Sequence, residues 1–284
     1  MKTILIPFDF SANARKALAY ALELGKLFES QLYIYHVLHE SPYTLAAAAT
    51  EQEMEKLIAK DGEEKTAALK DEVNTLLQSL PITFSAERIK TKAEYNPLVV
   101  EKIIAVAKEQ DAELVIMGTH GTSGIKKFFF GSNTSNMITK SDIPVLAIPE
   151  QYEYTPVKTI LYASDLENLP AELKRIIPFA HSLHAGINVL HFDYGQNERK
   201  ITEEEANIII KNNQYQHIKF VKEKADLTIT LLKQIRHYMQ EHQPEWLTMF
   251  TKEKSLWDKL IIGSKTEDMA HTLKVPLLSF KKPG

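Results

Sequence analysis

The stretch from Leu114 to Ser132, LVIMGTHGTSGIKKFFFGS, constrains the fold of this chain more than any other. It begins with an unbroken apolar run, Leu114 to Met117, which is too short for an ordinary helix and polar on neither face. Such a run predicts a central strand that is buried on both faces of a parallel sheet. The strand ends at Gly118, and Gly131 and Ser132 open a segment with helical spacing. The expected order is therefore strand, glycine-bounded loop and helix start.

This loop and the helix start after it suit a phosphate group. The first N–H groups of a helix lack partners within the helix and lie at the positive end of its dipole, and glycines let the backbone come close to a ligand. Gly121 lies inside the loop, and Ser132, Thr134 and Ser135 add hydroxyl donors. Glycines are also ordinary turn residues, and a serine can cap a helix without any ligand. The spacing alone leaves both interpretations open.

Composition narrows the class of protein. At 284 residues, with 44% apolar and 25% charged residues, the chain is long enough for two ordinary globular domains. A formal net charge of -3 gives no electrostatic footprint for nucleic acid, so we expect no nucleic-acid partner. The absence of cysteine excludes disulfides, thiolate metal sites and cysteine nucleophiles, and fits a reducing compartment.

The sequence also bears on location. The N-terminus, MKTILIPFDFS, is strand-like and is too short and too polar for a signal peptide. No stretch approaches the roughly 20 apolar residues that span a bilayer. We therefore expect no membrane partner and a cytoplasmic location.

Predicted strands and helices alternate over the first 150 residues. Strands are expected at Thr3–Ile6, Gln31–Val37, Ile82–Ile89, Leu114–Met117 and Ile143–Ile148. Helices are expected from a Ser11 cap to Leu27, at Glu51–Leu80, from Asn96-Pro97 to Gln110, and from Ser132. This alternation predicts a parallel, doubly wound α/β domain, in which ligands bind beyond the carboxyl ends of the strands. Asp9, at the end of the first strand, would then face the glycine loop and accept hydrogen bonds from a sugar or base; the alternative is a turn or capping aspartate.

The second half of the chain repeats the first. MKTIL at residues 1–5 returns as VKTIL at 157–161, Asp9 returns as Asp165, and His36 returns as His191. The third strand, the next helix and the fourth strand return as Gln216–Val221, Asp226–Glu241 and Trp246–Phe250. Gly131-Ser132 returns as Gly263-Ser264, and IPVLAI at 143–148 returns as VPLLSF at 275–280. A repeat at half the chain length indicates a duplicated domain. The expected domains are residues 1–149 and 157–284, joined by a linker at 150–156.

The two halves differ at the glycine loop. Phe250 stands where the first half has Gly118, and Glu253 stands where it has Gly121. A phenylalanine would oppose a polyphosphate by its bulk, and an added carboxylate would oppose it by like charge. The motif of the second domain is therefore degenerate.

With these residues in hand, the chain resembles a tandem, two-domain member of the universal stress protein family. The nucleotide-binding motif of that family is glycine, two residues, glycine, nine residues, glycine, then serine or threonine, and it is intact at Gly118, Gly121, Gly131 and Ser132. The resemblance implies two tandem Rossmann-like domains, each with a five-stranded parallel sheet in the order 3-2-1-4-5. It also implies ATP, with or without Mg²⁺, as an adenine nucleotide ligand of the first domain.

The resemblance further implies which residues hold the nucleotide. The adenosine side would be lined by Pro7, Phe8, Asp9 and Val37. The ribose and first phosphate would be covered by Met117, Gly118, His120 and Gly121, and the phosphate chain held by Gly131, Ser132, Asn133 and Thr134. Imidazole can act as an acid or base near neutral pH. The sequence gives His120 no orienting partner, so phosphate contact or loop packing is the preferred interpretation, and no catalytic residue and no metal ligand are assigned.

The last strand of each half would leave unpaired backbone groups at a sheet edge. Related proteins pair that edge with its counterpart in a dimer. Here Pro144–Ile148 is expected to pair antiparallel with Pro276–Phe280 of the same chain, which would make an intramolecular pseudo-dimer. A further homodimer of two chains stays an open alternative.

Three functions compete. The leading hypothesis is a stress-response protein whose first domain binds ATP as a regulatory ligand while the second is a degenerate partner or scaffold. The second is a slow ATPase or autophosphorylating enzyme, which the lack of a Walker lysine disfavours. The third is an interaction scaffold that binds no nucleotide in either half, or that binds another small molecule in the degenerate crevice of the second.

Overall fold

The computed structural model describes residues 2–39, 50–81, 83–119, 131–195, 201–251 and 274–282. The chain divides into two compact units, Met1–Glu150 and Gln151–Gly284. Among the described residues, no helix is both long enough and apolar enough to cross a membrane.

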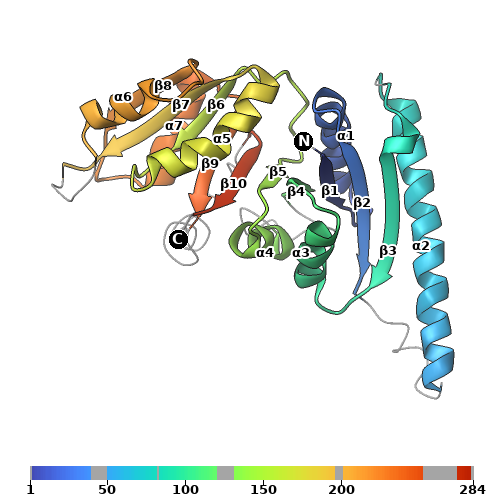
Figure 1. The fold of residues 1–284 in the computed structure, drawn as a ribbon. Helices are drawn as coiled ribbons and strands as arrows, with labels where there is room; N and C mark the ends of the chain where they lie inside the picture. Colours follow the sequence, from blue (N-terminus) through green and yellow to red (C-terminus); the bar gives the residue numbers. More distant parts are fainter. Residues whose placement is uncertain are drawn as a thin grey trace. The chain divides into compact units, whose positions relative to one another are not determined.

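The first unit is a doubly wound α/β unit with five parallel strands in the order β3-β2-β1-β4-β5 (Figure 1), which is the fold and strand order expected from the sequence. The strands are β1 (Thr3–Pro7), β2 (Gln31–Leu38), β3 (Ile89–Tyr95), β4 (Leu114–Gly118) and β5 (Val145–Ile148). The helices are α1 (Ala12–Leu27), α2 (Glu51–Ser79), the short 3₁₀ turn η2 (Ala86–Arg88), α3 (Val99–Glu109) and α4 (Ser132–Lys140).

The centre of this sheet is covered on both faces. Ile4, Leu5 and Ile6 of β1 are completely buried, and so are the first three residues of β4, Leu114 to Ile116. Neighbouring residues of a strand point to opposite faces, so burial of consecutive residues requires packed layers on both sides. The prediction that Leu114–Met117 is a central buried strand is therefore confirmed, with β1 on one side of it and β5 on the other.

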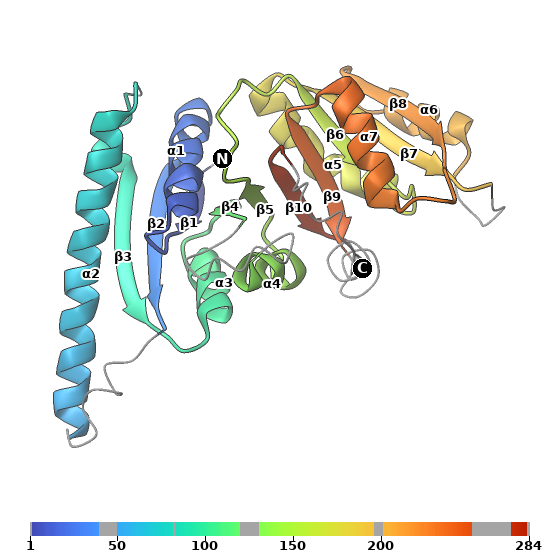
Figure 2. The same cartoon turned by 180° about the vertical axis from the view of Figure 1, so that it is seen from behind.

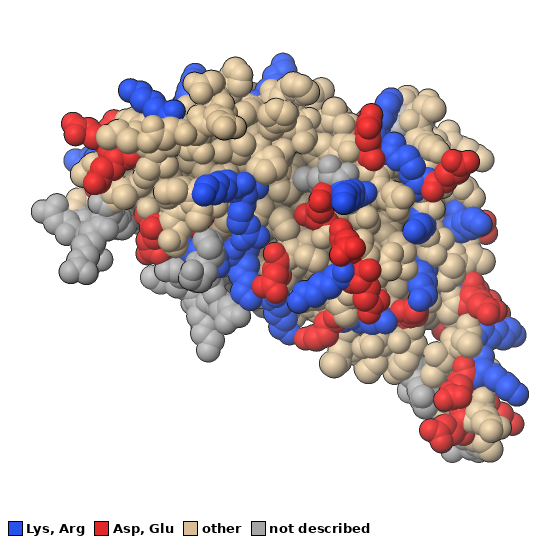
Figure 3. Space-filling model, in the orientation of Figure 1, with Lys and Arg blue, Asp and Glu red and all other residues tan. Residues whose placement is uncertain are grey.

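Helix α2 runs along the outer edge of β3 (Figures 1 and 2). The backbone N–H of Ala93 in β3 donates to Thr66 Oγ1 of α2 at 2.8 Å. A Cβ atom at Gly62 would lie 3.3 Å from the Ala93 carbonyl oxygen, so the glycine allows this close approach. A helix over an edge strand protects its unpaired backbone groups from pairing with another chain. The outward face of α2 carries basic and acidic side chains side by side (Figure 3).

The predicted starting residues of one strand and one helix in the first unit are wrong. The third strand was expected at Ile82–Ile89 but begins at Ile89, because the guanidinium of Arg88 stacks 4.8 Å from the Phe84 ring and donates to the Ser30 carbonyl oxygen. These contacts hold Phe84 and Arg88 against the end of α1 instead of in the sheet. Helix α3 begins at Val99, later than expected from Asn96-Pro97, because Asn96 Oδ1 accepts the N–H of Leu98 in a turn.

The second unit repeats this architecture, with parallel strands in the order β8-β7-β6-β9-β10. Its strands are β6 (Thr159–Ala163), β7 (Gly186–Asp193), β8 (Ile218–Lys224), β9 (Trp246–Thr251) and β10 (Leu277–Lys281). Its helices are α5 (Leu169–Leu183), α6 (Glu203–Lys211) and α7 (Leu231–His242). The helix expected from Asp226 begins later, because Asp226 Oδ1 closes a turn with the Thr228 N–H and Thr230 caps α7.

Candidate functional site

The first unit has a cavity of about 380 Å³ at the carboxyl ends of β1 and β4. All of the predicted site residues that the structure describes line it, namely Pro7, Phe8, Asp9, Val37, Met117, Gly118, Gly131, Ser132, Asn133 and Thr134. The other two, His120 and Gly121, lie outside the described residues. Segments separated by more than 100 residues in the sequence thus meet at one crevice, at the point where the strand order reverses.

The turn after β1 places Asp9 at this cavity. Its Oδ1 atom accepts the N–H of Ser11 at 3.1 Å, and Phe10 between them has a φ of 61°, in the left-handed region that few non-glycine residues adopt. Ser11 then caps α1, as predicted, by accepting the Ala14 N–H at 3.0 Å. Asp9 is therefore a turn aspartate, and its side chain also forms part of the cavity wall.

His36 fixes the same turn from β2. Its Nδ1 atom donates to the Phe8 carbonyl oxygen at 2.7 Å, and its ring lies edge-on to Phe10 with centroids 5.0 Å apart. Burial lowers the pKa of His36 below its usual value, although the hydrogen bond to Phe8 opposes this shift. A neutral ring that donates from Nδ1 indicates a structural role for His36.

Helix α4 begins at the opposite wall, with Gly131 as its N-cap. The Gly131 N–H donates to the Thr119 carbonyl oxygen at 2.7 Å, and Thr134 Oγ1 donates to the Gly118 carbonyl oxygen at 2.9 Å. The Thr134 hydroxyl thus ties α4 to the end of β4, so a phosphate contact from Thr134 would have to come from its backbone N–H. The side chains of Ser132 and Asn133 are exposed, and the first N–H groups of the helix have no acceptors within it.

Gly118 is required by packing. A Cβ atom at this position would lie 2.7 Å from Asn13 Cγ and 3.0 Å from the Asn13 carbonyl oxygen. Asn13 belongs to α1, is buried, and donates through Nδ2 to Thr119 Oγ1 at 3.3 Å. The expectation that this glycine serves the approach of a ligand is therefore incomplete, because α1 alone already excludes a side chain there.

Several lining residues were not predicted, namely Ala14, Tyr35, His36, His39, Val99 and Ile103. Val99 and Ile103 lie one turn apart on α3, so the apolar spacing of that helix was the available signal.

Tyr35 also contacts a carboxylate: its hydroxyl donates to Glu94 Oε2 at 2.6 Å. Partial burial alone would raise the pKa of Glu94, but hydrogen bonds from Lys92, Tyr35 and Lys102 lower it to about 2.

The second unit fills the position of Gly118 with Phe250. The strand register confirms this correspondence, because Phe250 lies opposite Phe280 in β10 as Gly118 lies opposite Ile148 in β5. The Phe250 ring is stacked on Phe280 with centroids 4.9 Å apart and lies edge-on to Tyr162 at 5.6 Å. Its bulk is therefore taken up by the core of the second unit. Glu253, Gly263 and Ser264 lie outside the described residues.

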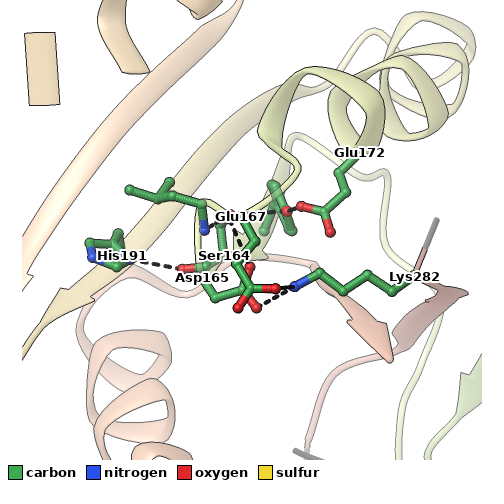
Figure 4. A network of polar contacts seen from close by, with 8 residues as sticks. Ser164, Asp165, Glu167, Glu172, His191 and Lys282 are labelled. Atoms are coloured by element: carbon green, nitrogen blue, oxygen red, sulfur yellow. Dashed lines mark hydrogen bonds and ion pairs between the residues drawn. The ribbon is translucent and has the colours of Figure 1, made fainter. Parts of the chain in front are cut away.

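The turn after β6 repeats the turn after β1 in detail. Asp165 Oδ1 accepts the Glu167 N–H at 3.1 Å, Leu166 has a φ of 66°, and His191 Nδ1 donates to the Ser164 carbonyl oxygen at 3.0 Å. The difference is that Asp165 also forms an ion pair with Lys282 (Figure 4). The aspartate that lines an open cavity in the first unit is thus bound by a lysine in the second.

These features define the first unit as a Rossmann-like α/β unit with a cavity at the switch point of its sheet. The family model of the universal stress protein family matches residues 1–149, which is more than half of the 284 residues. The chain belongs to the universal stress protein family.

Individual relatives agree with this assignment. Universal stress protein Sll1654 of Synechocystis is 30% identical over 149 residues, which cover 52% of this chain and 85% of the relative. Universal stress protein MJ0531 of Methanocaldococcus jannaschii is 26% identical over 148 residues, which cover 52% of this chain and 81% of the relative. The crystal structure of a universal stress protein from Archaeoglobus fulgidus superposes with a TM-score of 0.61 at 15% sequence identity. The match covers 99% of this chain and 96% of that protein's chain, so the two share the same fold.

Proposed function

We propose that the first unit binds an adenine nucleotide, with ATP as the leading candidate, in the cavity between β1 and β4. The proposal rests on the observation that Asp9 and the start of α4 line opposite walls of one cavity of about 380 Å³. The volume lies within the range of about 300–1,000 Å³ that is typical of small-molecule sites.

The two walls differ in chemistry in the way that a nucleotide requires. The phosphates lie at the N-terminus of α4, where backbone N–H groups and the helix dipole favour an anion. The adenosine lies toward Val37, Val99 and Ile103, which supply an apolar wall, and Asp9 accepts hydrogen bonds from the sugar or base.

The nucleotide acts as a regulatory ligand in a stress response. A ligand shifts a protein between conformations only in proportion to its different affinity for them. Gly118 at the end of β4 and Gly131 at the start of α4 both line the cavity, so we expect these two positions to respond to the ligand. The second unit serves as the partner or scaffold of the first and binds no nucleotide.

Ser132→Asp separates nucleotide binding from folding. Ser132 is the first residue of α4 and is exposed, and an acidic residue at a helix start is favourable by about 0.3–1 kcal/mol. The same charge would stand where the phosphates bind and repel them. The matched control is Ser132→Asn, which has nearly the same shape and no charge.

Isothermal titration calorimetry with ATP is the measurement. The wild type and Ser132→Asn should bind one nucleotide per chain, and Ser132→Asp should bind at least about tenfold more weakly, a change of about 1.4 kcal/mol. Equal affinities of the two variants, or no binding by the wild type, would sink the proposal.

A further inference from the structure

Lys282 lies beside the turn after β6, at the place in the second unit that corresponds to the cavity of the first. Its ammonium forms ion pairs with Asp165 and, at 2.9 Å, with Glu167 Oε2, and only 4% of its side chain is exposed. Figure 4 shows the side chain extending from the end of β10 toward these carboxylates. The backbone N–H of Lys282 donates to the Thr251 carbonyl oxygen at 2.8 Å, which fixes the base of the side chain.

The register shows that this lysine is a specific difference between the units. Phe280 corresponds to Ile148, so Lys282 corresponds to Glu150 of the first unit. The partner of Lys282, Asp165, corresponds to Asp9. An exposed glutamate in one unit is thus replaced by a buried lysine in the other, aimed at the equivalent aspartate.

A third carboxyl group lies near Lys282. Glu172 of α5 is completely buried, and its Oε2 atom accepts the hydroxyl of Tyr162. Its other oxygen, Oε1, has no hydrogen-bond partner among the described residues, and Figure 4 shows it on the side of the Lys282 chain. Burial raises the pKa of Glu172, while the hydrogen bond from Tyr162 and the positive charge of Lys282 oppose the shift.

We propose that the carboxyl groups of Asp165, Glu167 and Glu172 form a binding site for a primary ammonium group, which Lys282 fills from within the chain in place of a nucleotide. Three carboxyl groups around one site select a cation and repel a polyphosphate. An ammonium offers three donors on a compact charge, which suits several separate carboxyl oxygens. The chemical class of ligand is therefore a primary alkylamine, and the second unit is held closed without any ligand from solution.

Chemical rescue of Lys282→Ala tests this site in the full chain. Both tryptophans, Trp246 and Trp257, belong to the second unit, so thermal unfolding followed by tryptophan fluorescence reports that unit without any nucleotide. Failure of the nucleotide proposal would therefore leave this readout unchanged. Lys282→Ala should lower the unfolding midpoint by roughly 5 °C, because it leaves partly buried carboxylates without their cation. n-Butylammonium at tens of millimolar should restore the midpoint, and n-butanol should not.

Two controls make the outcome specific. Lys222 forms an ion pair with Asp193 at 2.9 Å in the same unit, but both side chains are more than 40% exposed. Lys222→Ala should change the midpoint little, and n-butylammonium should stabilise neither it nor the wild type. Lys282→Met keeps an apolar stem without the charge, so it should be less stable than Lys282→Arg, which keeps the charge.

Three outcomes would overturn the proposal. The first is an unfolding midpoint of Lys282→Ala equal to that of the wild type. The second is rescue of Lys282→Ala by n-butanol as large as that by n-butylammonium, which would indicate cavity filling alone. The third is stabilisation of the Lys222→Ala control by n-butylammonium as large as that of Lys282→Ala. If Lys282→Ala does not fold, a Lys282→Met midpoint that matches Lys282→Arg would overturn it as well.

Discussion

Replacement of Gly118 by alanine should destabilise the first unit through α1. The added Cβ would lie 2.7 Å from Asn13 Cγ, 3.0 Å from Asn13 Nδ2 and 3.0 Å from the Asn13 carbonyl oxygen. One of these atoms belongs to the backbone of a buried helix, so the contact is relieved only if α1 moves. Overpacking of this kind costs about 1–3 kcal/mol, which corresponds to roughly 3–10 °C in the unfolding midpoint of a unit of this size.

A double-mutant cycle with Asn13→Ala isolates the contact. Asn13→Ala removes the two side-chain atoms that the added Cβ would meet, and it also removes the hydrogen bond to Thr119 Oγ1. Gly118→Ala should therefore cost less in the Asn13→Ala background, with a coupling free energy of about 1 kcal/mol or more.

Hydrogen exchange followed by mass spectrometry is the suitable assay, because peptides of β1 and β4 report the first unit while peptides of β6 and β9 serve as an internal control. Additive effects of the two substitutions would refute the reasoning. A Gly118→Ala chain as stable as the wild type would refute it equally.

Two further predictions concern the core and the charges. Phe250→Ala should destabilise the second unit by about 3–5 kcal/mol, because it removes a buried ring that is stacked on Phe280. Urea unfolding followed by tryptophan fluorescence measures this loss. The variant should gain no ATP binding in the second unit, and an additional ATP site would contradict the account. Because the folded-state pKa of Glu94 is lowered from 4.5 to about 2, its stabilising effect is present above pH 4.5 and is lost as the pH falls toward 2. Glu94→Gln should therefore cost the first unit about 2 kcal/mol at pH 7 and almost nothing at pH 2, as measured by hydrogen exchange or urea unfolding, and a cost independent of pH would contradict this.

The parts of the fold that were predictable depend on local sequence. The burial of β4 followed from four consecutive apolar residues, and the start of α1 followed from Ser11, whose cap needs only residues three positions away. The repeat of the two units was also visible, because it preserves Asp9 and His36 as Asp165 and His191. The described part of the candidate site followed from the glycine spacing and the family resemblance.

The parts that were missed depend on contacts between distant residues. The third strand was misplaced because Arg88 bonds to Ser30, 58 residues earlier, and no local pattern shows this. The second role of Gly118 depends on Asn13, and the ion pair of the second unit joins Lys282 to Asp165, 117 residues apart. A lysine near a strand end is ordinary in a sequence and acquires meaning only when the sheet brings its partner to it.

The central claim is that a nucleotide binds in the first unit and nowhere else in the chain. Hydrogen exchange of the wild type with and without saturating ATP tests it most directly. ATP should slow exchange in peptides that contain Asp9, Val37 and the start of α4, and it should leave residues 157–282 unchanged. Protection in the second unit, or no protection in either, would contradict the account.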